Sequence, residues 1–181
     1  MFNRHLYWMT PIAIICSVNT CFATQYLSID QAQKLCFPKA TNWVTTTYHL
    51  SQEQIQAIEN ESGISVRFPE QKVWAAYRNK EFLGWFILDQ VVGKHELIQW
   101  AAAIDKNGSI QNLEILNYKE TFGYEVKQKK WRSQFIGKTV KDPLKLDQDI
   151  ENISGATLSS RHITEGVKRL LAFYETILKG S

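Results

Sequence analysis

The hydrophobic and polar positions along this chain follow two periods, which separate helices from strands. Apolar residues at helical spacing after a Ser-x-x-Gln capping box predict two short helices, one over residues 29–37 and one that begins after Ser51 and ends at Gly63. Runs rich in β-branched and aromatic residues predict strands elsewhere. The expected strands cover residues 43–49, 65–68, 73–78, 82–92, 96–104 and 110–118.

Consecutive strands with short connections predict an antiparallel sheet. The turn at residues 105–108 contains an Asn-Gly pair, which supplies the positive φ angles of a tight hairpin. Two further helices are expected over residues 125–134 and 159–179, the second with an apolar stripe. Gly166 lies either opposite that stripe or against the sheet, and the pattern does not distinguish the two. The fold class that follows is α+β, an antiparallel sheet of about five to six strands packed by helices.

The first 23 residues have the layout of a secretory signal peptide. Arg4 precedes an apolar run at residues 6–18, and Cys21-Phe22-Ala23 then offers small residues at the positions that a signal peptidase reads. The run has about 13 residues, fewer than the roughly 20 that span a bilayer. We therefore predict cleavage near Ala23 and a periplasmic or otherwise extracytoplasmic protein, with a retained N-terminal anchor as the alternative.

The cysteines, histidines and net charge argue against three functions: thiol catalysis, metal binding and nucleic-acid binding. Export would remove Cys16 and Cys21 and leave Cys36, on the apolar side of the first helix, as a buried thiol rather than a nucleophile. The remaining histidines are too scattered for a metal cluster, so no bound metal is expected. A net charge of +3 without a basic stripe argues against nucleic acid as a partner. Aromatic residues make up 12% of the chain, and such rings either fill a core or stack on a flat heterocycle.

A segment near the C-terminus has the features of a phosphate site. Residues 151–160 read Glu-Asn-Ile-Ser-Gly-Ala-Thr-Leu-Ser-Ser and lead into the last helix, where free backbone N–H groups and the helix dipole attract phosphate. Gly155 allows close approach, Ala156 adds little bulk, and Thr157 places a hydroxyl that can hydrogen-bond a phosphate or be esterified to it. The alternative is a plain helix start with Thr157 or Ser159 as its N-cap.

A second segment, Tyr-Lys-Glu-Thr-Phe-Gly-Tyr at residues 118–124, follows the hairpin strand at the end of the sheet. Together the two segments resemble the FMN-binding domain family, which occurs in one subunit of the sodium-translocating NADH:quinone oxidoreductase and in the equivalent Rnf subunit. Residues 151–160 look like its flavinylation motif, Asp-x-x-Ser/Thr-Gly-Ala-Thr. In that family a separate, magnesium-dependent flavin transferase joins the FMN phosphate to the final Thr, outside the cytoplasm. The resemblance covers residues 84–172.

The resemblance implies that Thr157 carries FMN as a phosphoester. Glu120 and Thr121 fall on the family's Glu-Thr-Pro-Gly-Leu-Gly segment, which helps to enclose the flavin ring, and the helix start would stabilise the phosphate charge. The expected cofactor-binding residues are Thr157, Ser154, Gly155, Ala156, Ser159, Ser160, Glu120, Thr121, Tyr118 and Lys94. The candidates for the ring wall are Trp85, Tyr118, Phe122, Tyr124 and Trp131. Lys94 and His95 would place positive charge beside the ring, unless they form only a solvated turn between strands.

The chain departs from the family pattern at four positions. Glu151 replaces the motif's Asp and is one methylene longer, which bears on how well a transferase can position its substrate. In the other segment Phe122 replaces Pro, Tyr124 replaces Leu and Glu125 replaces the second Gly. The attachment loop therefore matches the family better than the ring pocket does.

These observations favour an exported electron carrier that contains covalent FMN. Its implied partners are a flavin transferase, a membrane-bound electron donor and an extracytoplasmic electron acceptor. The expected organisation is a signal peptide at residues 1–23, an N-terminal helix and strand extension at 24–83, and the FMN-binding domain at 84–181. No nucleophile-and-base pair is evident. The alternatives are a flavin-dependent reductase with its own small substrate and a binding module of the same fold without flavin.

Overall fold

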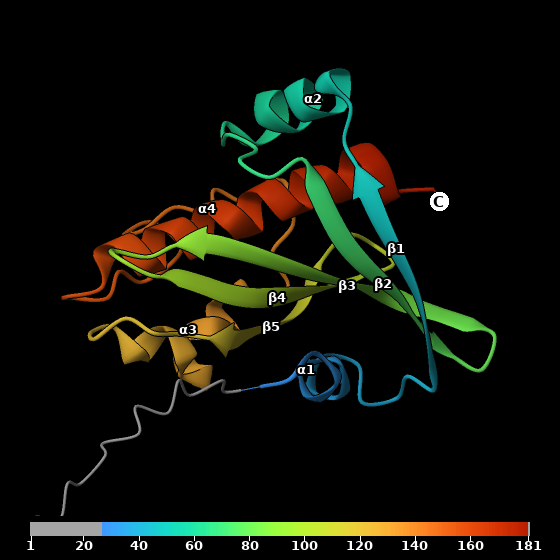
Figure 1. Ribbon diagram of the computed structural model, residues 1–181, viewed down its shortest axis with the longest axis horizontal. Helices are drawn as coiled ribbons and strands as arrows, with labels where there is room; N and C mark the ends of the chain where they lie inside the picture. The colour runs from blue at the N-terminus through green and yellow to red at the C-terminus, as the bar shows by residue number, and fades with distance from the viewer. Residues whose placement is uncertain (1–26, 181) are drawn as a thin grey trace, which may run out of the picture.

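The computed structural model describes residues 27–180. It contains a five-stranded antiparallel sheet with the strands in chain order (Figure 1). The strands are β1 (Asn42–His49), β2 (Glu70–Arg78), β3 (Glu81–Val92), β4 (Leu97–Asp105) and β5 (Ile110–Asn117). The α+β class is as predicted. The predicted signal peptide, with Cys16 and Cys21, lies outside the described residues.

Helices cover both faces of the sheet (Figure 1). On one face lie α2 (Gln52–Ser62) and the long α4 (Thr157–Phe173), and on the other lies α1 (Ile29–Cys36). Because side chains alternate along a strand, each strand contributes to both layers of core. On β3, for example, Ile87 belongs to the cluster under α4 and Phe86 to the cluster under α1.

The first two helices begin and end where the sequence predicts. Both have a complete capping box, with Gln31 bonded to Ser28 and Gln54 bonded to Ser51, and α2 ends at Gly63 in the left-handed conformation. Each box satisfies two backbone N–H groups locally, so these boundaries depend on a few neighbouring residues alone.

The strand predicted at residues 65–68 is wrong, because this segment is an irregular loop between α2 and β2. Two polar side chains take the place of a neighbouring strand. Glu59 Oε1 accepts from the Val66 backbone N–H at 2.8 Å, and Ser62 Oγ accepts from the Ile64 N–H at 3.1 Å. These two backbone N–H groups are therefore satisfied without a sheet ladder.

The helix predicted at residues 125–134 is also wrong as a single element. The segment divides into the 3₁₀ turn η1 (Tyr124–Lys127), the single turn α3 (Lys129–Arg132) and the 3₁₀ turn η2 (Ser133–Phe135). Gln128, between the first two, has extended backbone angles. Val126 and Trp131 are both buried, yet on one ideal helix they would point about 140° apart. The break turns both toward the core.

The last helix starts two residues earlier than predicted and finishes differently. Its apolar stripe packs on the sheet as expected, and the final turn, η3 (Tyr174–Leu178), is a π-helix. Gly166 lies against the sheet. A Cβ atom there would lie 2.6 Å from Cζ2 of Trp100 on β4, so the glycine lets α4 pack directly on the sheet.

The lone described cysteine, Cys36, is buried against the sheet, as predicted. Burial raises the pKa of its thiol far above the ordinary value, which removes the thiolate needed for nucleophilic chemistry. Within residues 27–180, none of the helices is both long and apolar enough to cross a bilayer.

Candidate functional site

A cavity of about 390 Å³ lies where three segments meet at one end of the sheet. These are the turn between β3 and β4, the segment that follows β5, and the start of α4, which lie together in Figure 1. The lining residues are Lys94, His95, Glu120, Thr121, Phe122, Gly155, Ala156, Thr157, Leu158 and Ser159. The volume lies within the roughly 300–1,000 Å³ typical of small-molecule sites. The fold thus brings together residues that are far apart in the chain, such as Lys94 and Thr157.

The loop before α4 is held in place by the segment that carries α3. Trp131 Nε1 donates to the Glu151 carbonyl at 2.8 Å, and the Glu151 N–H donates to Gln134 Oε1, also at 2.8 Å. Further along, the Ala156 N–H donates to the Ile153 carbonyl at 3.0 Å. Gly155 has φ +81°, a backbone conformation that glycine adopts more readily than any other residue, and there is open space around it.

The start of α4 presents backbone donors to the cavity. Ala156 is its N-cap and supplies no side-chain hydrogen bond, so the plain helix start capped by Thr157 or Ser159 is not what forms. Among the described residues, no acceptor is bonded to the N–H groups of Thr157, Leu158 and Ser159. The Thr157 hydroxyl likewise has no partner within residues 27–180, and it lines the cavity. Free N–H groups together with the positive end of the helix dipole favour an anion here.

A buried carboxylate joins the opposite walls of the cavity. Glu120 Oε1 accepts from the backbone N–H groups of His95 at 2.7 Å and Glu96 at 3.0 Å. Burial alone would raise the pKa of Glu120. The N–H donors of Glu96, His95 and Lys94 outweigh it, so the pKa is below its ordinary value and the group is ionised. A Cβ atom at Gly93 would overlap this oxygen, so glycine is needed for the contact.

The segment after β5 also packs directly on the loop before α4. The Tyr118 hydroxyl donates to the Phe122 carbonyl at 2.5 Å and lies 3.4 Å from Ser159 Oγ. Gly123 has φ +86°, and a Cβ atom there would overlap the Ala156 Cβ. The two segments therefore fit each other through a glycine and an alanine, and larger residues would push them apart.

The structure brings seven of the ten predicted site residues to the cavity wall. Tyr118 supports the wall from behind through its hydroxyl. Ser154 lies outside the cavity on the exposed side of the loop. Ser160 is fully buried, and its hydroxyl donates to carbonyls of the preceding turn, among them Ala156 at 3.1 Å. Leu158 is a lining residue that sequence reasoning missed, because nothing in the pattern marks an exposed leucine in the first helical turn as part of a site.

The predicted ring wall is only partly present. Phe122 lines the cavity and is 74% exposed, so it is free to cover a ligand. Trp85 and Trp131 are instead core residues, the former edge-on to Phe82. Tyr124 lies outside the cavity, beneath the Lys127 ammonium group at 4.1 Å from the ring centre. Among residues 27–180, burial in the core accounts for most of the aromatic side chains, as is usual for large apolar groups.

We expect Glu120→Ala to destabilise the protein by about 1–3 kcal/mol, because it removes the charged acceptor of two backbone N–H groups in the β3–β4 turn. Glu120→Gln should lose less, since an amide oxygen can still accept. The folded-state pKa lies below the ordinary 4.5, so the carboxylate contributes stability above that pH and loses it as the pH falls through the folded value. Thermal unfolding at several pH values between roughly 3 and 6 measures this. An acid-induced loss of stability as steep in Glu120→Gln as in the wild type would contradict the assignment.

Known proteins are similar to this chain over the segments that form the cavity. The FMN-binding domain family matches residues 93–172, from the β3–β4 turn to the middle of α4. The chain is 24% identical over 158 residues to a subunit of the Na⁺-translocating ferredoxin:NAD⁺ oxidoreductase complex of Acetobacterium woodii, a match that covers 82% of this chain and 74% of that protein. The crystal structure of NqrC from Shewanella oneidensis shares the fold with a TM-score of 0.52 and 14% identity, over 79% of this chain and 84% of that one.

The family match begins at Gly93 rather than at the expected residue 84, and it includes both segments that carry the resemblance. Strands β1 and β2 and helices α1 and α2 precede it. The family match, the Acetobacterium woodii relative and the shared fold together support an FMN-binding domain over residues 93–172 of this chain.

Proposed function

We propose that this chain is an exported electron carrier whose FMN is joined to Thr157 through a phosphoester. The observation that carries the proposal is the position of Thr157. Its unpartnered hydroxyl, within the described residues, lies in the first turn of α4, beside three free backbone N–H groups and inside the cavity of the FMN-binding domain.

The donors and apolar groups around the cavity suit the two ends of FMN. The N–H groups at the start of α4 would hold the phosphate oxygens, with Lys94 supplying a cation from the facing turn. Phe122 and Leu158 would cover the apolar ring, and Ala156 leaves room beside it. Bound FMN supplies the ability to accept and release electrons, and the surrounding charges tune its potential.

Glu120 has a structural part in this arrangement. Its Oε1 accepts from two backbone N–H groups, so we assign it the role of fixing the turn that carries Lys94 rather than that of a base. The backbone N–H dipoles of Glu96, His95 and Lys94 point at the negative charge and partly offset its repulsion of an anionic ligand.

A covalent link has a physical advantage for a protein outside the cytoplasm, where lost flavin is not readily replaced. The phosphoester removes dissociation and leaves the pocket free to set the redox properties. Maturation would then require a flavin transferase. The Acetobacterium woodii relative is by name part of a Na⁺-translocating oxidoreductase complex, and ions are translocated across membranes, which supports a membrane-bound electron donor for this chain. An extracytoplasmic acceptor completes the proposed path.

The proposal is tested by producing the full chain in a host with a flavin transferase and in an otherwise identical host without one. Flavin fluorescence should persist on a denaturing gel only in the first case, with a mass increase equal to FMN less one water. Turnover of a small substrate by the isolated protein would favour the reductase alternative. Colourless protein from the first host would favour the module without flavin.

We further expect the protein to be exported and cut after Ala23, so that the mature chain begins at Thr24. Cell fractionation with N-terminal sequencing measures both. Replacing Ala23 with Arg should block cleavage, because a signal peptidase requires a small residue there. An uncut chain in the cytoplasmic fraction would contradict the proposed location.

A further inference from the structure

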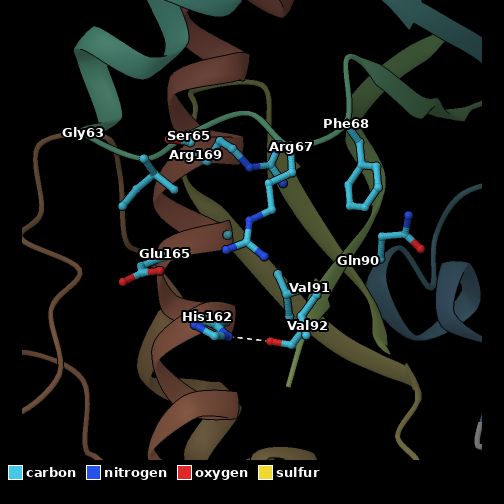
Figure 2. A pocket seen from close by; sticks show the side chains of 12 residues that line it. Gly63, Ser65, Arg67, Phe68, Gln90, Val91, Val92, His162, Glu165 and Arg169 are labelled. Atoms are coloured by element: carbon cyan, nitrogen blue, oxygen red, sulfur yellow. Dashed lines mark hydrogen bonds between the residues drawn. The ribbon is translucent and has the colours of Figure 1, made fainter. Parts of the chain in front are cut away.

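A second cavity, of about 320 Å³, lies against α4 and shares no lining residue with the FMN cavity (Figure 2). Three elements form it: the loop after α2, the end of β3 and the middle of α4. His162 lines this cavity, and its Nδ1 forms a hydrogen bond with the Val92 carbonyl at the end of β3. The volume again falls in the range of small-molecule sites.

A buried guanidinium contributes to this cavity. Arg169 on α4 bonds Asp89 on β3 through Nη2, with 2.6 Å between Nη2 and Oδ2, and the two side chains are 10% and 5% exposed. A guanidinium has five N–H donors, and no other hydrogen bond to Arg169 occurs within residues 27–180. Its remaining nitrogens are not among the buried unsatisfied atoms, so they reach the solvent-filled space of the cavity.

A second guanidinium enters from the opposite wall. Arg67 extends from the loop after α2 into the cavity toward α4 (Figure 2). In the described part of the chain it has neither a hydrogen-bond partner nor an ion pair. Arginine presents a planar fork of donors that matches a carboxylate, which makes two arginines in one cavity a favourable place for such a group.

The rest of the lining combines apolar residues with the polar Ser65, Gln90 and His162 and one acidic residue, Glu165. Ile64, Phe68 and Val91 provide an apolar wall, and the Phe68 ring is partly exposed. Glu165 lies on α4 at the edge of the cavity, with its carboxylate directed away from Arg67 (Figure 2). Asp89 forms an ion pair with Arg169, so Arg67 is the positive charge that is available to a ligand. A ligand with a second negative group would be repelled by Glu165.

We propose that this cavity binds a small monocarboxylate with an apolar body, its carboxylate held by Arg67 and the free donors of Arg169. The ligand's apolar part packs against Phe68 and Val91. The site does not depend on FMN, since its residues belong to neither the attachment loop nor the segment after β5.

The probe for the test is benzoate, titrated into the ¹⁵N-labelled full chain and followed by amide chemical shifts. We expect saturable shifts confined to residues 63–68, 90–92 and 162–169. Arg67→Gln should raise the apparent Kd about tenfold, which is the loss of affinity expected when a charge-assisted hydrogen bond is removed. The matched control is Arg161→Gln, which replaces an exposed arginine of α4 outside the cavity and should bind like the wild type.

Two further ligands separate charge recognition from simple filling of an apolar space. Benzyl alcohol keeps the ring without the carboxylate and should give no saturable shift. Phthalate should bind more weakly than benzoate, and Glu165→Gln should reduce the difference. The proposal is overturned if benzoate produces no saturable shift at these amides, if benzyl alcohol binds as well, or if Arg67→Gln leaves the Kd unchanged.

Discussion

Thr157→Ala is expected to abolish the proposed covalent attachment of flavin completely while leaving the fold intact. The phosphoester needs the hydroxyl oxygen, which alanine lacks. The same hydroxyl makes no hydrogen bond within the described chain, and the helix is capped at Ala156 rather than by Thr157. The free energy of unfolding should therefore change by no more than about 0.5 kcal/mol, as at sites without a structural role. Fluorescence on a denaturing gel and intact mass measure the first effect, and denaturant unfolding measures the second.

Neighbouring hydroxyls provide the controls for Thr157. Ser154→Ala should keep the flavin, because Ser154 is exposed outside the cavity. Thr157→Ser retains the hydroxyl and should keep part of the modification. Denaturation-resistant fluorescence in Thr157→Ala at the wild-type level would show that the attachment point is elsewhere.

Asp89→Ala is expected to cause the largest loss of stability among the substitutions considered. The Arg169–Asp89 pair joins α4 to the centre of the sheet, and both side chains are at least nine-tenths buried. Removing one member of such a pair leaves an uncompensated buried charge, which costs about 3–5 kcal/mol. For a chain of this length the melting temperature should fall by about 10 °C or more. Thermal and urea unfolding measure the change.

Two comparisons distinguish loss of the pair from loss of a side chain. Replacing both members with apolar residues, Asp89→Leu with Arg169→Met, should recover most of the stability, because no charge is then left buried. Glu81→Ala removes one member of the exposed Arg78–Glu81 pair and should cost less than about 1 kcal/mol. A similar small effect in Asp89→Ala would contradict the inferred burial of the pair.

The sequence by itself determined the elements whose ends depend on neighbouring residues. Two capping boxes and the glycine at residue 63 define α1 and α2, and the predicted turn joins β4 to β5, with a positive φ at Gly108 but not at Asn107. Such signals act through hydrogen bonds and φ angles within a few residues, so they can be read without the rest of the chain. The same holds for the loop before α4, whose order of small residues and a threonine carries the family resemblance and lies in the matched region.

Only the tertiary structure decided which side chains share a cavity. Trp85 and Phe122 are equally good candidates for the ring wall from the sequence. Packing places Trp85 in the core and Phe122 in the cavity lining. The segment at residues 124–135 breaks because two buried side chains must reach the same core. The tertiary structure likewise decided that Glu120 contacts the β3–β4 turn and that a second cavity forms beside Arg67. These features depend on contacts between distant segments, which local propensity does not specify and which form only when the sheet and α4 come together.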